Sequence, residues 1–236
     1  MAAALSLIAA GGFGERTARL LSAQFAGSAV LSPDGVEQAL GTSRGTVVLA
    51  AQNPAPSLCE RLDDLAYRFS RPWLPVVMDN SVVRVGPLVR PPYGPCFRCF
   101  QGRRAQHDRE AAATALLHRS YDTGQHSGPG GFLPHHARLA AAVAATCLRA
   151  VPEAGAPDGP YDSVVTTIRL REWGMTRNHV VPRHGCPRCG SSGAVASGAV
   201  ASGAVASGRE TTGGTGSGRL REALSALSLR TAEAGR

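Results

Sequence analysis

ALSLIAAGGFGERTARLLSAQF, residues 4–25, is the stretch that decides the fold. It opens with an almost continuous apolar run at residues 4–10, which is typical of a strand buried on both faces of a parallel sheet. A Gly-Gly-Phe-Gly turn follows, and apolar residues then recur at Ala18, Leu21 and Phe25 with the spacing of a helix. The stretch therefore predicts a strand, a glycine turn and a helix, which together open an α/β fold.

The chain after this stretch keeps alternating between apolar strand-like runs and helical spacing. The expected strands are 28–33, 45–51, 73–79, 82–89, 162–173 and 176–183, and the expected helices are 34–44, 56–71, 108–119 and 133–151. Alternation of this kind predicts the α/β fold class, with a Rossmann-like, mainly parallel sheet flanked by helices. Residues 1–190 are expected to form this domain.

The C-terminal segment differs in composition. GAVAS occurs three times in tandem between residues 193 and 207, and Gly, Ala and Ser dominate this part of the chain. A five-residue period matches neither a strand nor a helix, so residues 191–218 are expected to form a disordered, low-complexity linker. Apolar residues at Leu220, Leu224 and Leu227 predict a short helix within 219–236.

The composition is that of a basic chain without a membrane segment. The formal charge is +8, and all 25 basic residues are arginine. These arginines are scattered and lack the interleaved aromatic residues of a single-strand binder, which argues against nucleic-acid binding. The longest apolar runs are too short or too interrupted to span a bilayer, and no basic region precedes the first of them. The chain is therefore expected to be cytoplasmic.

Four of the six cysteines form two C-x-x-C pairs, Cys96 with Cys99 and Cys186 with Cys189. Two such pairs supply four thiolates, which is the closed tetrahedral ligand set of structural zinc. Two other interpretations stay open, a redox C-x-x-C, which needs only one pair, and four incidental buried thiols. Structural zinc is favoured, and a complete set of four ligands leaves the metal no open position for catalysis.

The remaining cysteines and the basic run after the first pair have plainer interpretations. Cys59 and Cys147 fall on expected helices among apolar neighbours, where free cysteine is commonly a small core residue. QGRR at 101–104 is interpreted as a solvated exit from the first cysteine pair. No catalytic residue is assigned in this chain.

The glycine turn allows two interpretations. Gly12 and Gly14 fit the first two glycines of G-x-G-x-x-G, a motif that lets the backbone approach a nucleotide pyrophosphate at a helix N-terminus. Thr17 stands where the third glycine would be, and no acidic residue ends the second expected strand. A cofactor role in binding ATP therefore stays open, and a tight turn inherited with the fold is favoured over it.

Taken together, residues 4–190 resemble the adenylating, ubiquitin-activating-like proteins of the ThiF/MoeB family. The resemblance rests on the opening strand, glycine turn and helix, on RPWLPVVMDNSVVRVGPLVRPPYGPCFRC at 71–99, and on RHGCPRCG at 183–190. The middle stretch is most similar to the ThiF-like cyclodehydratase partners, or precursor leader peptide-binding proteins, of azole and thiopeptide biosynthesis. In this family the four paired cysteines hold a structural zinc ion, as the resemblance implies here.

The resemblance implies a partner protein that presents a precursor (leader) peptide to a YcaO-type cyclodehydratase, in the biosynthesis of azole-containing peptides of the bacteriocin or thiopeptide type. Catalytic adenylating relatives keep an aspartate after the third strand, where this chain has AAQNPAP at 50–56, and this favours a non-catalytic role. The alternative is an ATP-dependent adenylating enzyme acting on a peptide or carrier-protein C-terminus. A winged-helix-like leader-binding segment is not recognised before the first strand, and a homodimer is expected as in the family.

Overall fold

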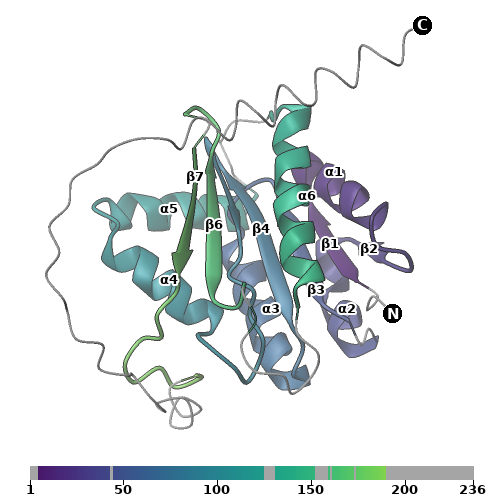
Figure 1. Cartoon of the computed structure of the whole chain (residues 1–236). Helices are drawn as coiled ribbons and strands as arrows, with labels where there is room; N and C mark the ends of the chain where they lie inside the picture. Colours follow the sequence, from purple (N-terminus) through teal and green to yellow (C-terminus); the bar gives the residue numbers. More distant parts are fainter. Residues whose placement is uncertain are drawn as a thin grey trace, which may run out of the picture. The chain divides into compact units, whose positions relative to one another are not determined.

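A computed structural model describes residues 5–42, 45–124, 131–151, 159, 161–172 and 174–189 (Figure 1). The predicted linker at 191–218 and the predicted helix at 219–236 lie outside these residues. Across the described part of the chain, no helix combines the length and the apolar character that crossing a membrane requires.

A mixed sheet lies at the centre of the described residues, with seven strands in the order β2-β1-β3-β4-β5-β6-β7. The first four strands pair in parallel and the last three extend the sheet in antiparallel fashion. The strands are β1 (Ser6–Ala10), β2 (Ala29–Leu31), β3 (Val47–Ala51), β4 (Trp73–Asp79), β5 (Val82–Val85), β6 (Val164–Arg169) and β7 (Gly174–His179). The predicted α/β fold class is confirmed.

The change from parallel to antiparallel pairing occurs at the link between β4 and β5. Only Asn80 and Ser81 join these strands, and parallel neighbours would need a crossover of a dozen or more residues. Asn80 adopts a positive φ of 54°, which asparagine tolerates well and which tight hairpin turns require. The sequence between the two strands therefore permits only an antiparallel hairpin.

Helices cover the parallel part of the sheet on both faces, as Figure 1 shows for α1 and α6 on one side. The helices are α1 (Gly11–Ser22), the short 3-10 helix η1 (Pro33–Gly35), α2 (Val36–Thr42), α3 (Pro56–Phe69), α4 (Phe97–Gln106), α5 (Ala111–Asp122) and α6 (Pro134–Arg149). Each face has its own apolar core. Leu7 and Ala9 belong to the core on the α1 and α6 side, and Ile8, between them, belongs to the core against α2 and α3. This alternation is the period of two of a strand that is buried on both faces.

The structure corrects the interpretation of QGRR at 101–104 as a solvated exit. These residues lie inside α4, which begins directly after Cys96. Phe97 and Phe100 in its first turn pack on each other, and Phe97 also packs on Trp73 of β4, with ring centroids 5.0 Å apart. The helix thus depends on tertiary contacts at one end and has no apolar stripe along its length, which is why its sequence did not predict it.

Candidate functional site

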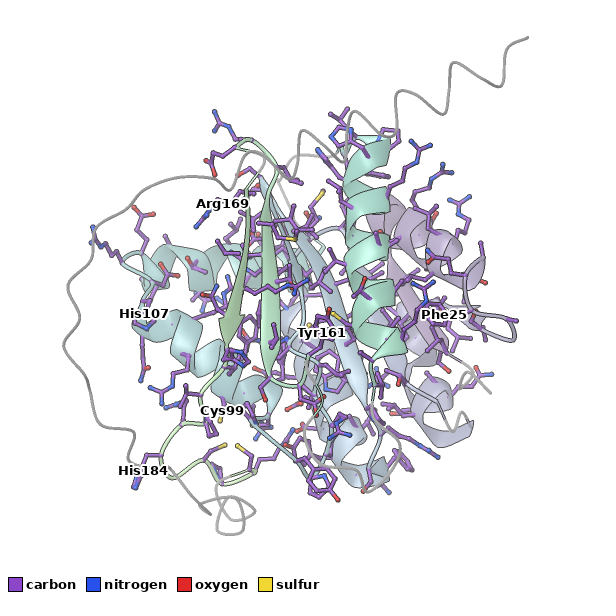
Figure 2. The ribbon with its side chains drawn as sticks, in the orientation of Figure 1. Phe25, Cys99, His107, Tyr161, Arg169 and His184 are labelled. Atoms are coloured by element: carbon purple, nitrogen blue, oxygen red, sulfur yellow. The ribbon has the colours of Figure 1, made fainter. Side chains whose placement is uncertain are left out.

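The four paired cysteines come together in space, although 90 residues separate the two members of each cross-pair contact. Cys96 and Cys99 lie at the start of α4, and Cys186 and Cys189 lie in turns beyond β7. Their Sγ atoms are all within 4.8 Å of one another, with 3.6 Å between Cys96 and Cys186 and 3.3 Å between Cys99 and Cys189. In Figure 2 the labelled Cys99 lies beside the segment that carries His184.

This cluster fits a tetrahedral metal ion. A Zn–S bond of about 2.3 Å in a regular tetrahedron places the four sulfur atoms roughly 3.8 Å apart. The sulfur separations above are close to that value, so the four cysteines are positioned to hold one metal ion. No oxygen or nitrogen ligand is needed to complete such a set.

The same geometry bears on the redox interpretation. The first pair does begin a helix, as a redox pair would, since Cys96 precedes α4 and Cys99 is in its first turn. All four thiols are free, however, and the second pair closes over the first at contact distance. Redox chemistry requires only one pair of thiols, whereas a tetrahedral metal ion requires four ligands at this distance from one another.

A buried carboxylate connects the second cysteine pair to the core. Asp63 of α3 is fully buried and accepts hydrogen bonds from Arg188 Nη1 at 2.7 Å, from Trp73 Nε1 at 3.2 Å and from the Phe97 backbone N–H at 3.4 Å. Burial raises the pKa of the Asp63 carboxyl, and the Arg188 guanidinium and the Trp73 hydrogen bond oppose that rise. Arg188 lies between Cys186 and Cys189, so this ion pair holds the second pair in place.

Two further contacts hold the cluster together. Arg188 lies over the ring of Tyr67, 5.1 Å from the ring centroid, and Tyr67 packs against the four cysteines. The backbone N–H of Arg183 donates to Cys99 Sγ at 3.3 Å. Such outer contacts orient metal ligands and are part of a metal site. Sequence analysis did not identify Asp63 or Tyr67, because neither is near a cysteine pair in the sequence.

Gly14 is required at the glycine turn for close packing of α1 on the sheet. A Cβ at this position would lie 2.2 Å from the Ala50 carbonyl oxygen of β3. Gly12 is less constrained, since a Cβ there would lie 3.3 Å from the Phe132 ring. Close packing of α1 against β3 accounts for glycine at position 14. Nucleotide binding by Gly12 and Gly14 stays a prediction.

A side chain of the protein itself bonds one backbone N–H at the N-terminus of α1. Gln52, directly after β3, accepts a hydrogen bond from the Phe13 backbone N–H through Oε1 at 3.1 Å. Its Cβ would lie 2.9 Å from a Cβ on Gly11, which shows how closely the side chain covers the turn. The ring of Phe132 adds an edge-to-face contact with Phe13, with centroids 5.7 Å apart. One of the helix N–H groups that could meet an anion in a phosphate-binding turn is thus already bonded, while Gly11 and Gly12 stay exposed.

The two unpaired cysteines are core residues, as the sequence indicated. Cys59 of α3 and Cys147 of α6 are each only 3% exposed. Burial raises the pKa of Cys59 to about 12 and the pKa of Cys147 to about 11. Neither thiol is therefore available as a nucleophile at neutral pH.

The strand order, the glycine turn and the closing four-cysteine cluster define an α/β protein with four cysteines positioned to hold one metal ion. Neither the scan of protein-family models nor the search of curated proteins gave a match. Solved structures do match the fold, and the resemblance noted in the sequence is confirmed at that level.

Three of these structures are the heterocyclase TruD, the E. coli microcin synthetase complex McbBCD, and E. coli MccB with selenomethionine MccA. Their TM-scores are 0.56, 0.54 and 0.52, at sequence identities of 20%, 13% and 13%. The alignments cover 79%, 78% and 79% of this chain. The chain spans only 27% of the TruD chain, and 67% and 66% of the other two. At these identities the similarity establishes a common fold.

Proposed function

We propose that this chain is a non-catalytic, ThiF-like partner protein that presents a precursor (leader) peptide to a YcaO-type cyclodehydratase in the biosynthesis of azole-containing ribosomal peptides. The observation that carries the proposal is the fold, which the chain shares with the heterocyclase TruD and with a chain of the microcin synthetase complex McbBCD. The four-cysteine cluster, at the positions that the family resemblance implies, adds to this support.

The contacts of Gln52 at the glycine turn support the non-catalytic part of the proposal. In a sheet of this kind, ligands bind beyond the carboxyl ends of the strands, where neighbouring connections run to opposite faces. Here that place lies between β1 and β3, where the Gln52 side chain lies against Gly11 and bonds the Phe13 N–H. An adenylating enzyme would need this N–H and the surrounding space for a nucleotide.

Zinc is the metal that the proposal assigns to the cysteine cluster. Four thiolates in tetrahedral arrangement select zinc or iron, and structural zinc is the usual occupant of a closed Cys₄ site. In this role the ion would hold the start of α4 and the end of the domain together. It would supply no reactive position, because all four ligands come from the protein. The proposal places the protein in the cytoplasm, with residues 191–236 as a tail outside the 1–190 domain.

Co-purification from cells tests the proposal. The tagged, metal-loaded chain is co-expressed with the YcaO-type enzyme and the precursor peptide encoded beside it. The expected result is that the enzyme, the precursor or both copurify with the chain, and that azole formation depends on its presence. Folded, metal-loaded protein that retains neither would contradict the proposal.

ATP–pyrophosphate exchange separates this function from the alternative, an adenylating enzyme acting on a peptide or carrier-protein C-terminus. The proposal expects no exchange above background with the precursor peptide as substrate. Exchange by the wild-type chain would favour the alternative. In that case, loss of exchange in Gly12→Val, whose new side chain would project beside Gln52 and Phe132, would locate the nucleotide at the turn.

A further inference from the structure

A groove lies between helices α4 and α5 and the antiparallel end of the sheet. Its volume is about 1100 Å³, and its lining comes from β4, β5, β6, β7 and the segment after β7 as well as from the two helices. Figure 1 shows α4 and α5 beside β6 and β7, away from α1 and α6. The groove is distinct from the glycine turn and from the four-cysteine cluster, since neither contributes to its lining.

The pairing register explains which side chains form the floor of the groove. Arg84 of β5 lies opposite Thr167 of β6, and Val165 of β6 lies opposite Asn178 of β7. Directly opposed residues, and residues two apart on one strand, share a face of a sheet. These four side chains therefore form one continuous surface, and all four line the groove. The opposite face carries Val83, Val85 and Ile168, which belong to the core under α6.

The α5 wall of the groove is sparsely packed. None of the residues of α5 is buried, and Leu117 is 37% exposed. Ala111, Thr114, Ala115 and His118 recur at helical spacing along the groove side of α5. Apolar side chains also contribute from elsewhere in the lining, at Phe100, Val165, Val180 and Val181. Phe100 and Val165 are already buried, so a partner in this groove would bury apolar area mainly at Leu117 and at Val181, which is 60% exposed.

Guanidinium groups outnumber carboxylates along the α4 wall. The carboxylate of Asp79 lies 2.7 Å from Arg84 Nη1 and 3.7 Å from Arg104 Nη2, so one acid serves two arginines. Burial, followed by the charge of Arg84, lowers the pKa of Arg104, whose side chain is still 34% exposed. Arg103, also in the lining, donates to the carbonyl oxygens of Val181 and Pro182. A carboxylate beside Arg104 would balance the second guanidinium.

We propose that this groove binds an extended peptide segment of another chain, and that a carboxylate side chain of this peptide pairs with Arg104. With about 1100 Å³, the groove lies at the upper end of the volumes of ligand sites, roughly 300–1,000 Å³, and is large enough for a short extended peptide. Phe100 is the only aromatic residue other than histidine in the described lining, and Asp79 and Asp108 line it too, which disfavours a polyanionic nucleic acid. The inference deepens the proposed function, on which it rests for the peptide nature of the natural partner.

Selection from a library of short random peptides displayed on phage, against the metal-loaded chain, tests the groove directly. Enriched peptides should combine acidic and apolar residues. Fluorescein-labelled copies of these peptides should bind the wild-type chain in anisotropy titrations. Arg104→Gln should weaken that binding roughly tenfold, the cost of losing one charge-assisted contact. Arg98→Gln on the same helix is the matched control, because Arg98 pairs with Asp64 outside the groove and should leave binding unchanged.

A second pair of variants tests the α5 wall without touching buried residues. Leu117→Glu places an acid in the groove and should repel the selected peptides, reducing their affinity at least as much as Arg104→Gln. Leu116→Glu is the control, since Leu116 is 61% exposed and does not line the groove. Circular dichroism and metal content should be unchanged in both exposed variants.

The outcomes separate this inference from the proposed function. Absence of enrichment, equal loss with the control variants, or preferential binding of a labelled single-stranded oligonucleotide would each overturn the groove assignment. If that happens while the YcaO-type enzyme and precursor still copurify with the chain, the proposed function stands and peptide binding lies elsewhere. If selected peptides bind as expected but neither partner copurifies, the groove stands and the proposed function fails.

Discussion

At the scale of single residues, Asp63 connects three parts of the chain that lie far apart in sequence. It bonds the Trp73 indole of β4, the Phe97 N–H at the start of α4 and the Arg188 guanidinium between the last two cysteines. A buried acid is unfavourable unless it is paired and hydrogen-bonded. Here both carboxylate oxygens are used, and the acid therefore fixes where α4 and the second cysteine pair meet.

We expect Asp63→Asn to destabilise the protein by about 3 kcal/mol, because it removes one partner of a buried ion pair and leaves Arg188 with only the half-exposed Asp64 as an acidic partner. Urea unfolding monitored by circular dichroism would measure this. Zinc affinity, measured by competition with a chromophoric chelator, should fall in the same variant. Glu60→Gln on the same helix is the control, since Glu60 is exposed and its substitution should cost less than about 1 kcal/mol. Equal effects of the two substitutions would contradict the role assigned to Asp63.

Gly14 supports a second prediction at this scale. Gly14→Ala should destabilise the domain by about 1–3 kcal/mol, the usual cost of overpacking, because the new Cβ would overlap the Ala50 carbonyl oxygen. Gly12→Ala meets only the edge of the Phe132 ring and should change stability by less than about 1 kcal/mol. Thermal unfolding of both variants measures the difference. A similar loss in both would show that the turn needs glycine for another reason.

At the scale of elements, the strands and helices whose apolar pattern is regular were predicted, and α4 was not. The predicted strand at 73–79 matches β4, and the predicted helix at 133–151 matches α6 within two residues at each end. Alanines spaced along one face of α6 are buried, which is the pattern that its sequence shows. FRCFQGRRAQ of α4 has two aromatic residues in its first turn and then only polar or small residues. Its position is decided by Trp73 and the cysteine cluster, which no local pattern records.

The exposed helix α5 carries a group whose titration affects stability. Burial, and then the charge of Arg104, lowers the pKa of His118 below its ordinary value of 6.5, and Asp79, Asp122 and Asp108 oppose this. The unfolded chain therefore binds the proton more tightly than the folded chain does. As pH falls below 6.5, protonation favours the unfolded state, so the free energy of unfolding decreases.

We expect His118→Asn to flatten this dependence. The variant should lose less stability than the wild-type chain between pH 6.5 and the lower, folded-state pKa of His118. Urea unfolding across this range, with zinc held in excess, provides the measurement. Arg119→Gln, at the next position of α5, controls for substitution on this helix and should keep the wild-type slope. An unchanged slope in His118→Asn would contradict the prediction.

At the scale of the whole molecule, the cysteine cluster joins positions that are 90 residues apart. Everything between them, including α4, α5, α6 and the antiparallel strands β6 and β7, lies inside the loop that a bound ion would close. A cross-link that closes a loop of about 100 residues stabilises a fold by roughly 4–5 kcal/mol in the chain-entropy account. A metal ion at this site is therefore expected to support the domain as a whole.

Metal removal tests this expectation. The chain should contain one zinc ion, and chelation should lower the midpoint of the main unfolding transition, because metal-binding energy is partly folding energy. Cys186→Ser should do the same without a chelator. Cys147→Ala is the control, since Cys147 lies in α6 away from the cluster and the variant should keep its zinc. An unchanged unfolding midpoint after complete zinc removal would contradict the structural role.

The parts of the site that the sequence predicted are those whose residues lie close together along the chain. The spacing within each C-x-x-C pair indicated four metal ligands, because each pair is local in sequence. The hydrogen bond between Gln52 and Phe13, 39 residues apart, has no such local signal, and neither has the contact between Asp63 and Arg188, 125 residues apart. These contacts exist only once the sheet has brought its strand ends together.

The segment after β7 contributes residues both to the groove and to the four-cysteine cluster. Val180 and Val181 line the groove, Arg103 binds the Val181 and Pro182 carbonyl oxygens, and Cys186 follows within the same short stretch. A metal ion that fixes the conformation of this stretch would also fix the residues that contact the peptide, and a bound peptide would likewise fix the residues near the metal ion. If the ion and the peptide both order this stretch, their binding is coupled, and each raises the affinity of the other by the same factor. The availability of zinc in the cell would then affect the affinity of this protein for its peptide.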